Sequence, residues 1–432
     1  MTPQDKLVDL IKRKGIGKTM SKALDKADCD LTINLLSNPT ILAESKTTLL
    51  VAFIMLKNTP TEQICLQQIQ TNYKTLLPKE CHFLFNTSEK STQSALISCI
   101  HHILNQQDLS SNQLKIVTET LFDSTLSNCY KAAFLEGLRL KEESPLENSF
   151  FQDYLYQKAK RININTPILI DLSTAYDGFN RFPNLILALA ALLASIGFPT
   201  ILHGCKDVSP KFGITLHKCL DQLQLNPLKT MKDIQKCLES PTIGWGYCDQ
   251  SISFPELHQL EPCRKAMVKR PILATVEKFM QPFHSKQTCI VTGYTHPAYR
   301  HKTTSLLQLL PHCHQFTFFR GVEGSCLAPL DRRCPVVTQS APSSTPQEGF
   351  ISPEDFNLEK NNYIQADRSL TVTQTCVHIT NALKHNTSPE GQWIIYNALA
   401  LLTQFGFKTP HTKSQLNKSI TSGKAWKHLI AY

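Results

Sequence analysis

The sequence has little of what marks secreted or membrane-spanning proteins. Its 15 cysteines are scattered singly without any C-x-x-C pair, so we expect small buried hydrophobes rather than a disulfide framework. The longest apolar run, Leu185 to Ile196, falls well short of the roughly 20 residues that span a bilayer. The first residues lack the basic-then-apolar layout of a secretion signal. These absences predict a cytoplasmic protein without a membrane segment.

Acidic residues are scarce relative to basic ones. The chain has 45 Lys and Arg against 35 Asp and Glu, which gives a net charge of +10. No acid follows Glu390, whereas lysines recur there at Lys408, Lys413, Lys418, Lys424 and Lys427. Such an excess is compatible with nucleic acid, phosphorylated metabolites or a membrane surface as partner. The alternative is that the basic C-terminal helix is an ordinary solvated face. The charge alone therefore does not identify a partner.

Hydrophobic residues make up 41% of the 432 residues, enough for a large core. Residues 1–165 show apolar positions at helical spacing and are predicted to form a helical N-terminal region. Pro60 and Glu62 follow one amphipathic segment, and Pro145 and Glu147 follow a similar one. We therefore expect an internal duplication; the alternative is chance similarity between helices. The predicted copies are residues 1–75 and 105–160, with a polar linker at residues 86–93.

After residue 165 the pattern changes to short apolar runs that alternate with loops and helices. This alternation predicts an α/β domain over residues 166–432 with a central, mostly parallel sheet. A helical insertion is expected near residues 256–285, and a surface loop at residues 340–349. The predicted strands are 167–171, 199–203, 288–292 and 316–319, and the predicted helices are 184–195 and 215–223.

Two loops follow predicted strands and lead into helices, where parallel sheets bind ligands. They span Asp171–Arg181 and His203–Gly213, and each offers hydroxyls, glycine and cations that could hold a phosphate. Ordinary turns between strand and helix are the alternative for both. The candidate phosphate- or nucleic-acid-binding residues are Ser173, Thr174, Asp177, Gly178, Arg181, His203, Gly204, Lys206, Ser209 and Lys211.

The second loop carries a resemblance. Residues 197–204, followed by Lys211–Thr215, resemble the core motif of the anthranilate phosphoribosyltransferase family (glycosyltransferase family 3), in which a strand ends in Lys-His-Gly-Asn-Arg. Five further segments match the family in order: Leu114–Glu147, Phe254–Leu257, Phe318–Gly324, Ser388–Ala400 and Ser422–Ala425. The resemblance implies a helical N-terminal bundle that mediates a homodimer, and an α/β phosphoribosyltransferase-like domain.

The sequence departs from the family where phosphate and metal bind. Active members hold phosphoribosyl pyrophosphate (PRPP) with a Gly-Thr-Gly-Gly-Asp loop, but residues 171–178 lack that glycine cluster. The Lys-His-Gly-Asn-Arg motif becomes Leu202–Lys206, which loses one cation and replaces an arginine by a lysine. The family's magnesium-holding Asp-Glu pair is replaced by Val322–Ser325, which leaves Glu323 as a weak candidate metal ligand.

These departures resemble a branch of the family whose members bind DNA and RNA without sequence preference. The resemblance implies a homodimer that binds nucleic acid through cations on the substrate-side segment, namely Arg264, Lys265, Lys269 and Arg270. Tyr294, Tyr299 and Trp426 could stack on bases. The alternative is a transferase that uses PRPP and Mg²⁺ with an unknown acceptor held by Arg264 and Arg270. A third interpretation is that the protein is a scaffold kept for dimeric assembly. The sequence assigns no catalytic residue.

Two smaller patterns have competing interpretations. His312-Cys313-His314 resembles a metal clip, but neighbouring strand residues point to opposite faces, so a metal site is not expected. Residues 244–247, Gly-Trp-Gly-Tyr, could form a mobile lid or a simple turn with a packed tryptophan.

Overall fold

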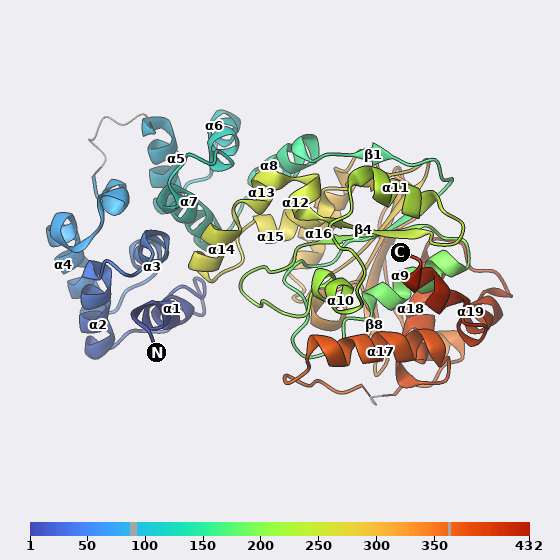
Figure 1. Ribbon diagram of the computed structural model, residues 1–432. Helices are drawn as coiled ribbons and strands as arrows, with labels where there is room; N and C mark the ends of the chain where they lie inside the picture. Colours follow the sequence, from blue (N-terminus) through green and yellow to red (C-terminus); the bar gives the residue numbers. More distant parts are fainter. Residues whose placement is uncertain (87–92, 362–363) are drawn as a thin grey trace. The chain divides into compact units, whose positions relative to one another are not determined.

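The computed structural model describes residues 1–86, 93–361 and 364–432, which form two compact units (Figure 1). Unit 1 contains Met1–Tyr154 and Glu256–Thr275, and unit 2 contains Leu155–Pro255 and Val276–Tyr432. The insertion expected near residues 256–285 is therefore divided between the two units. Most of the linker expected at residues 86–93 lies outside the described residues.

Unit 1 is built from helices. Its elements are α1 (Pro3–Lys14), α2 (Lys26–Ser37), α3 (Ala43–Met55), α4 (Pro60–Leu76), the 3-10 helix η1 (Lys79–Leu84), α5 (Ser94–Leu104), α6 (Ser111–Leu121), α7 (Asn128–Lys141), α8 (Pro145–Lys158), α13 (Pro255–His258), α14 (Glu261–Met267) and α15 (Leu273–Val276). Of these, α8, α13 and α15 each cross the boundary to unit 2 by one or a few residues. The helices α3 and α7 pack against each other, and α14 contacts both of them.

Helix starts in unit 1 repeat with a constant offset. The helices α6, α7 and α8 begin 85 residues after α2, α3 and α4 (111 − 26, 128 − 43 and 145 − 60). The N-terminal caps repeat as well. Asp25 and Ser110 each cap their helix with a reciprocal side-chain bond three residues on, and so do Thr59 and Ser144.

The same offset relates two buried carboxylates. Glu62 accepts from the backbone N–H of Leu24 at 3.1 Å, and Glu147 accepts from that of Leu109 at 3.1 Å. Each is also paired with a buried lysine: Lys14 lies 2.9 Å from Glu62, and Lys141 lies 2.9 Å from Glu147. The carboxylates and the amides that donate to them share the offset, whereas the two lysines do not (141 − 14 = 127). The shared positions support the expected duplication, which stays a prediction.

Unit 2 is organised around a seven-stranded sheet with the order β4-β3-β2-β6-β7-β8-β9. The first five strands are parallel, and β8 and β9 are antiparallel additions at one edge. The strands are β2 (Leu169–Leu172), β3 (Thr200–Gly204), β4 (Trp245–Asp249), β6 (Thr288–Gly293), β7 (Gln315–Phe319), β8 (Cys334–Gln339) and β9 (Gln347–Ile351). The predicted α/β class with a mostly parallel sheet is confirmed.

Helices and a small second sheet complete unit 2. In that sheet β1 (Ile162–Asn163) pairs with β5 (Phe283–His284). The helices are α9 (Ile186–Ser195), α10 (Leu216–Gln222), α11 (Met231–Glu239), α12 (Gln250–Ser253), α16 (Tyr299–Gln308), α17 (Val372–Lys384), α18 (Pro389–Gln404), α19 (Thr412–Thr421) and α20 (Lys424–Ile430), with the 3-10 helices η2 (Glu277–Phe279), η3 (Val322–Gly324) and η4 (Pro353–Phe356).

One local prediction is wrong, and a second is right only in part. The segment 244–247 is neither a lid nor a turn, because residues 245–249 form the buried strand β4. The Trp245 indole donates to the His428 carbonyl at 2.8 Å and stacks on Tyr432, which fixes the strand beneath α20. The expected loop at 340–349 ends in strand β9, which pairs with β8.

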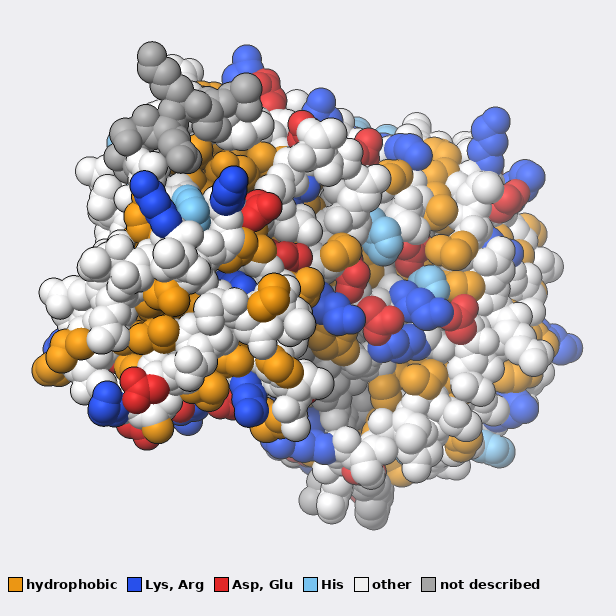
Figure 2. Space-filling model, turned by 60° about the vertical axis from the view of Figure 1, so that its left-hand side comes forward, with side chains coloured by type: hydrophobic (Ala, Val, Ile, Leu, Met, Phe, Trp, Pro, Cys, Tyr) orange, Lys and Arg blue, Asp and Glu red, His pale blue; other side chains and the backbone are white. Residues whose placement is uncertain are grey.

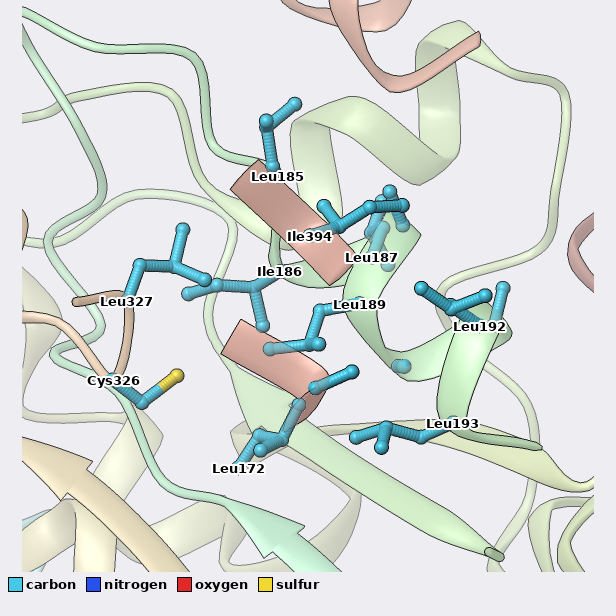
Figure 3. Packing of buried hydrophobic residues seen from close by; sticks show 14 of the residues in the cluster. Leu172, Leu185, Ile186, Leu187, Leu189, Leu192, Leu193, Cys326, Leu327 and Ile394 are labelled. Carbon is cyan, nitrogen blue, oxygen red and sulfur yellow. The ribbon is translucent and has the colours of Figure 1, made fainter. Parts of the chain in front are cut away.

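The helix α9 lies at the centre of the core of unit 2. Each of its residues from Ile186 to Ser195 is buried, and its leucines pack among side chains from the sheet, from residues 326–327 and from α18 (Figure 3). It contacts β3, α18 and α20. Despite this apolar character, no helix in the described part of the chain is long and apolar enough to cross a bilayer.

The buried ion pairs of unit 1 give a stability prediction. Glu62→Ala leaves the Lys14 ammonium, which is 1% exposed, without its carboxylate, and should lower the free energy of unfolding of unit 1 by about 3–5 kcal/mol. Urea unfolding followed by circular dichroism measures the change. The control Asp30→Ala removes the partner of Lys26 from a largely exposed pair and should leave stability unchanged. Equal losses in both variants would contradict the role of the buried pair.

Candidate functional site

A buried hydrogen-bonded chain joins the carboxyl ends of β2 and β3. Asp171 Oδ1 lies 3.0 Å from His203 Nε2, and His203 Nδ1 lies 2.6 Å from the Tyr176 hydroxyl. The Tyr176 hydroxyl also donates to the Glu277 carbonyl at 3.1 Å, which ties this chain of side chains to a third segment. All three side chains are buried, and burial raises the pKa of Tyr176 well above its usual value. These hydrogen-bonded side chains therefore hold the two loops in position, and solvent does not reach them.

The loop after β2 presents three successive backbone N–H groups to one carboxylate. The amides of Asn180, Arg181 and Phe182 donate to Glu323 at 2.8–3.2 Å, and Asn180 reaches both carboxylate oxygens. Lys211 Nζ lies 3.2 Å from Glu323 Oε2. We call these three amides and the Lys211 ammonium the amide cradle. Successive amides that converge on one point form a concave site for anions.

The turn that carries Glu323 is held in a fixed position. Glu323 has a φ of +52°, in the left-handed region that non-glycine residues avoid. The turn lies so close to neighbouring backbone that a Cβ at Gly293 would come within 1.8 Å of the Ser325 carbonyl oxygen, and one at Gly321 within 2.0 Å. Both glycines are therefore needed for this turn to lie against the end of β6.

The predicted phosphate-binding residues are only partly brought together. Asp177, Gly178, Arg181 and Lys211 lie at or beside the amide cradle: Lys211 donates to the Gly178 carbonyl at 3.1 Å and lies 3.9 Å from Asp177. The buried residues Ser173, Thr174, His203, Gly204 and Ser209 lie along the strand ends and loops behind it. Lys206 is exposed and is paired with Asp221 at 3.2 Å.

Sequence reasoning missed the backbone donors of residues 180–182 and the phenol of Tyr176. Amide groups have no side-chain signature, so only a fold-level argument could have found them. Lys278, a further cation after the substrate-side segment, is buried and donates to the Gly293 carbonyl at 3.1 Å, so it does not belong to a basic surface. Burial lowers the pKa of Lys278 to about 8.

The expected magnesium role of Glu323 does not fit its surroundings. Both carboxylate oxygens already accept bonds from N–H donors, which repel a cation. Among the described residues no group of three or more His, Cys, Asp or Glu side chains could hold a metal ion. We therefore derive no step that uses Mg²⁺ at this position.

The predicted cations of the substrate-side segment belong to unit 1. Arg264 is buried within α14, whereas Lys265 and Arg270 are exposed. Lys269 is half-buried, and its pKa is lowered to about 8, chiefly by burial and secondly by the nearby Arg139 guanidinium. Arg264 is thus not available on the surface as the prediction assumed, while Lys265 and Arg270 are.

The C-terminal helices of unit 2 carry exposed lysines. Lys418 on α19 and Lys424 and Lys427 on α20 form no ion pair with any described residue. Trp426 lies among them, with Lys384 Nζ 4.4 Å from its ring centroid. We call these four lysines and Trp426 the C-terminal basic surface. On the face of unit 2 shown in Figure 2, by contrast, basic side chains are interspersed with acidic ones.

His312 takes part in a stacking cluster. Its ring lies parallel to that of His284 with centroids 3.8 Å apart, and Tyr156 lies 6.2 Å away on an edge of the cluster. The Arg161 guanidinium covers the Tyr156 ring at 3.6 Å. His314 is held separately, since its Nδ1 accepts from the Thr288 amide at 3.1 Å. The segment 312–314 is therefore a packing element.

Comparisons with known proteins agree with this architecture. No family model matches the chain. An uncharacterized protein of Aquifex aeolicus (strain VF5) is 26% identical over 268 residues, which cover 62% of this chain and 78% of that protein. An anthranilate phosphoribosyltransferase of Clostridium kluyveri is 23% identical over 335 residues, 77% of this chain and 96% of that protein.

Solved structures show the same fold. The anthranilate phosphoribosyltransferase of Thermus thermophilus matches with a TM-score of 0.61 and 16% identity, over 77% of this chain and 98% of that chain. The Saccharomyces cerevisiae enzyme in complex with PRPP and Mg matches with a TM-score of 0.57 and 12% identity, over 86% and 97%. The chain therefore shares the fold of these enzymes. Its sequence is similar to those of anthranilate phosphoribosyltransferases as well.

The stacked histidines give a pH prediction. Burial, together with His312 and Arg161, lowers the pKa of His284 from 6.5 to about 4. Below pH 6.5 the unfolded chain takes up a proton that the folded chain excludes, so stability should fall as the pH drops from about 6.5 to 4. Urea midpoints measured across this range test the slope. His284→Gln should flatten it, whereas the exposed control His411→Gln should not; an unchanged slope in His284→Gln would contradict the assignment.

Proposed function

We propose that this protein binds nucleic acid without sequence preference, on an anthranilate phosphoribosyltransferase-like fold whose substrate site has changed. The observation that carries the proposal is the contrast between two sets of cations. The three lysines near the strand ends are paired with acids, whereas Lys418, Lys424 and Lys427 of the C-terminal basic surface form no ion pair with any described residue. Arg181 of the first loop is exposed as well. An unpaired surface lysine exchanges its counterion for a nucleic-acid phosphate at little cost.

Three lysines near the strand ends are neutralised by acids. Lys206 pairs with Asp221 at 3.2 Å, Lys211 with Glu323 at 3.2 Å, and Lys218 with Asp207 at 2.6 Å. A diphosphate entering there would have to displace a carboxylate before it could bind. This pairing disfavours PRPP as the ligand of the wild-type protein.

The C-terminal basic surface has the composition of a site for single strands. Lysines follow the backbone through charge, and an aromatic ring offers a face for stacking a base irrespective of its identity. Trp426 is half-buried: one part of the indole packs against the core, and Lys384 Nζ lies 4.4 Å from the ring centroid, so a stacking base takes the place of that ammonium. Lys265 and Arg270 are exposed on unit 1, and we propose them as phosphate contacts of that unit, whether or not Arg270 has a partner within the chain.

The direct test is binding of a fluorescent single-stranded oligonucleotide across a salt series, with PRPP and Mg²⁺ as competitor. We expect the oligonucleotide affinity to fall steeply with salt, because binding releases counterions from the phosphates. We expect PRPP and Mg²⁺ not to change it, because they do not compete for the C-terminal basic surface. Absence of oligonucleotide binding at low salt would overturn the proposal.

A paired substitution localises the surface. Lys424→Ala with Lys427→Ala should weaken oligonucleotide binding and reduce the slope of log K against log salt by about 0.7 per lysine lost. The control Lys26→Ala with Lys236→Ala removes two exposed lysines that are paired with Asp30 and Asp233. An equal effect in the control would show that net charge alone, not this surface, governs binding.

The second candidate is a transferase that uses PRPP. It is supported by the solved structure of the yeast enzyme, which was determined with PRPP and Mg. A rise in melting temperature with PRPP and Mg²⁺, without oligonucleotide binding, would favour it. Both candidate functions are compatible with a homodimer formed through the helical unit. Sedimentation equilibrium measures the mass of the particle and so tests for the dimer.

A further inference from the structure

We propose that the amide cradle is an anion site whose resident ligand is Glu323, so that the chain blocks its own binding site for a phosphate or diphosphate group. The juxtaposition of Asn180–Phe182 amides, Lys211 and Glu323 carries this inference. It does not depend on nucleic-acid binding at the C-terminal basic surface.

The donors of the cradle are suited to an anion rather than to a neutral group. Three consecutive amides and one ammonium converge within 3.2 Å of a single carboxylate. Together the four donors satisfy the lone pairs of a carboxylate that is only 2% exposed. The same donors fit the oxygens of a phosphate, which also carries negative charge.

The occupant comes from a distant part of the chain and is built into place. Glu323 lies 141–143 residues after the amides it binds, and its side chain is only 2% exposed. Its left-handed backbone and the two glycines beneath the turn show that the carboxylate is delivered at a conformational cost. The cradle follows β2 at the carboxyl edge of the parallel strands, where sheets of this kind bind ligands.

An external anion and Glu323 therefore compete for one set of donors. Because the carboxylate is tethered, it is present at a high effective concentration, and free phosphate at ordinary concentrations does not displace it. Removing the carboxylate leaves the amides and Lys211 without their partner. The vacated donors then bind an anion from solution.

The test measures inorganic pyrophosphate and, separately, inorganic phosphate by calorimetric titration. Glu323→Ala should bind pyrophosphate at least about tenfold more tightly than the wild-type protein, because the amides and the Lys211 ammonium then donate to the pyrophosphate oxygens in place of the carboxylate. Adding Lys211→Ala to Glu323→Ala should reverse the gain. The control Glu348→Ala removes one acid of unit 2 from its surface pair with Arg300, and should leave affinity unchanged.

If Glu323→Ala does not fold, Glu323→Gln retains an accepting oxygen and the side-chain volume while removing the charge, and should still bind pyrophosphate more tightly than wild type. No gain in any folded variant would overturn the proposal, as would an equal gain in Glu348→Ala. Oligonucleotide affinity measured on the same variants separates the two proposals. It should be unchanged if the cradle and the C-terminal basic surface are distinct sites.

Discussion

The complete burial of α9 is the constraint on which unit 2 depends. A helix that is apolar on every side must be covered on every side, and here β3 lies against one part of it and α18 and α20 against others. The C-terminal helices are thus tied to the sheet through α9. The loop that contains the amide cradle leads directly into this helix, so its amides are presented from a fixed support. The positions of the cradle amides are therefore fixed by the hydrophobic packing of α9, which begins a few residues after them.

The distribution of charge follows from the same arrangement. Side chains at the sheet edge are largely enclosed, and an enclosed charge is tolerated only with a partner. Lys211 therefore has Glu323, and Asp171 has His203. On α19 and α20 water solvates the lysines, so no partner is needed. The enclosed Lys211 is thus paired with a carboxylate, whereas the exposed Lys418, Lys424 and Lys427 form no ion pair with any described residue.

Much of the fold could be predicted from the sequence, because continuous apolar runs marked β2, β3, β6 and β7 closely. The strand β4 was missed because glycines flank its tryptophan and suggest a turn, whereas burial against Tyr432 decides its conformation. The antiparallel strands β8 and β9 carry mixed polar residues and have no comparable signal. At the site, Lys211 and Glu323 were identified separately. Their convergence depends on backbone amides, which no residue type reveals.

The repeated helix bounds of unit 1 also bear on how the chain assembles. Within one molecule α3 packs against α7, its counterpart 85 residues later (128 − 43). Elements that resemble each other this closely can exchange between molecules when two chains fold in proximity. The first set of helices in one molecule can then pack against the second set of a neighbouring molecule instead of its own. Synthesis from the N-terminus limits this exchange, because each copy meets its tethered neighbour before it meets another molecule.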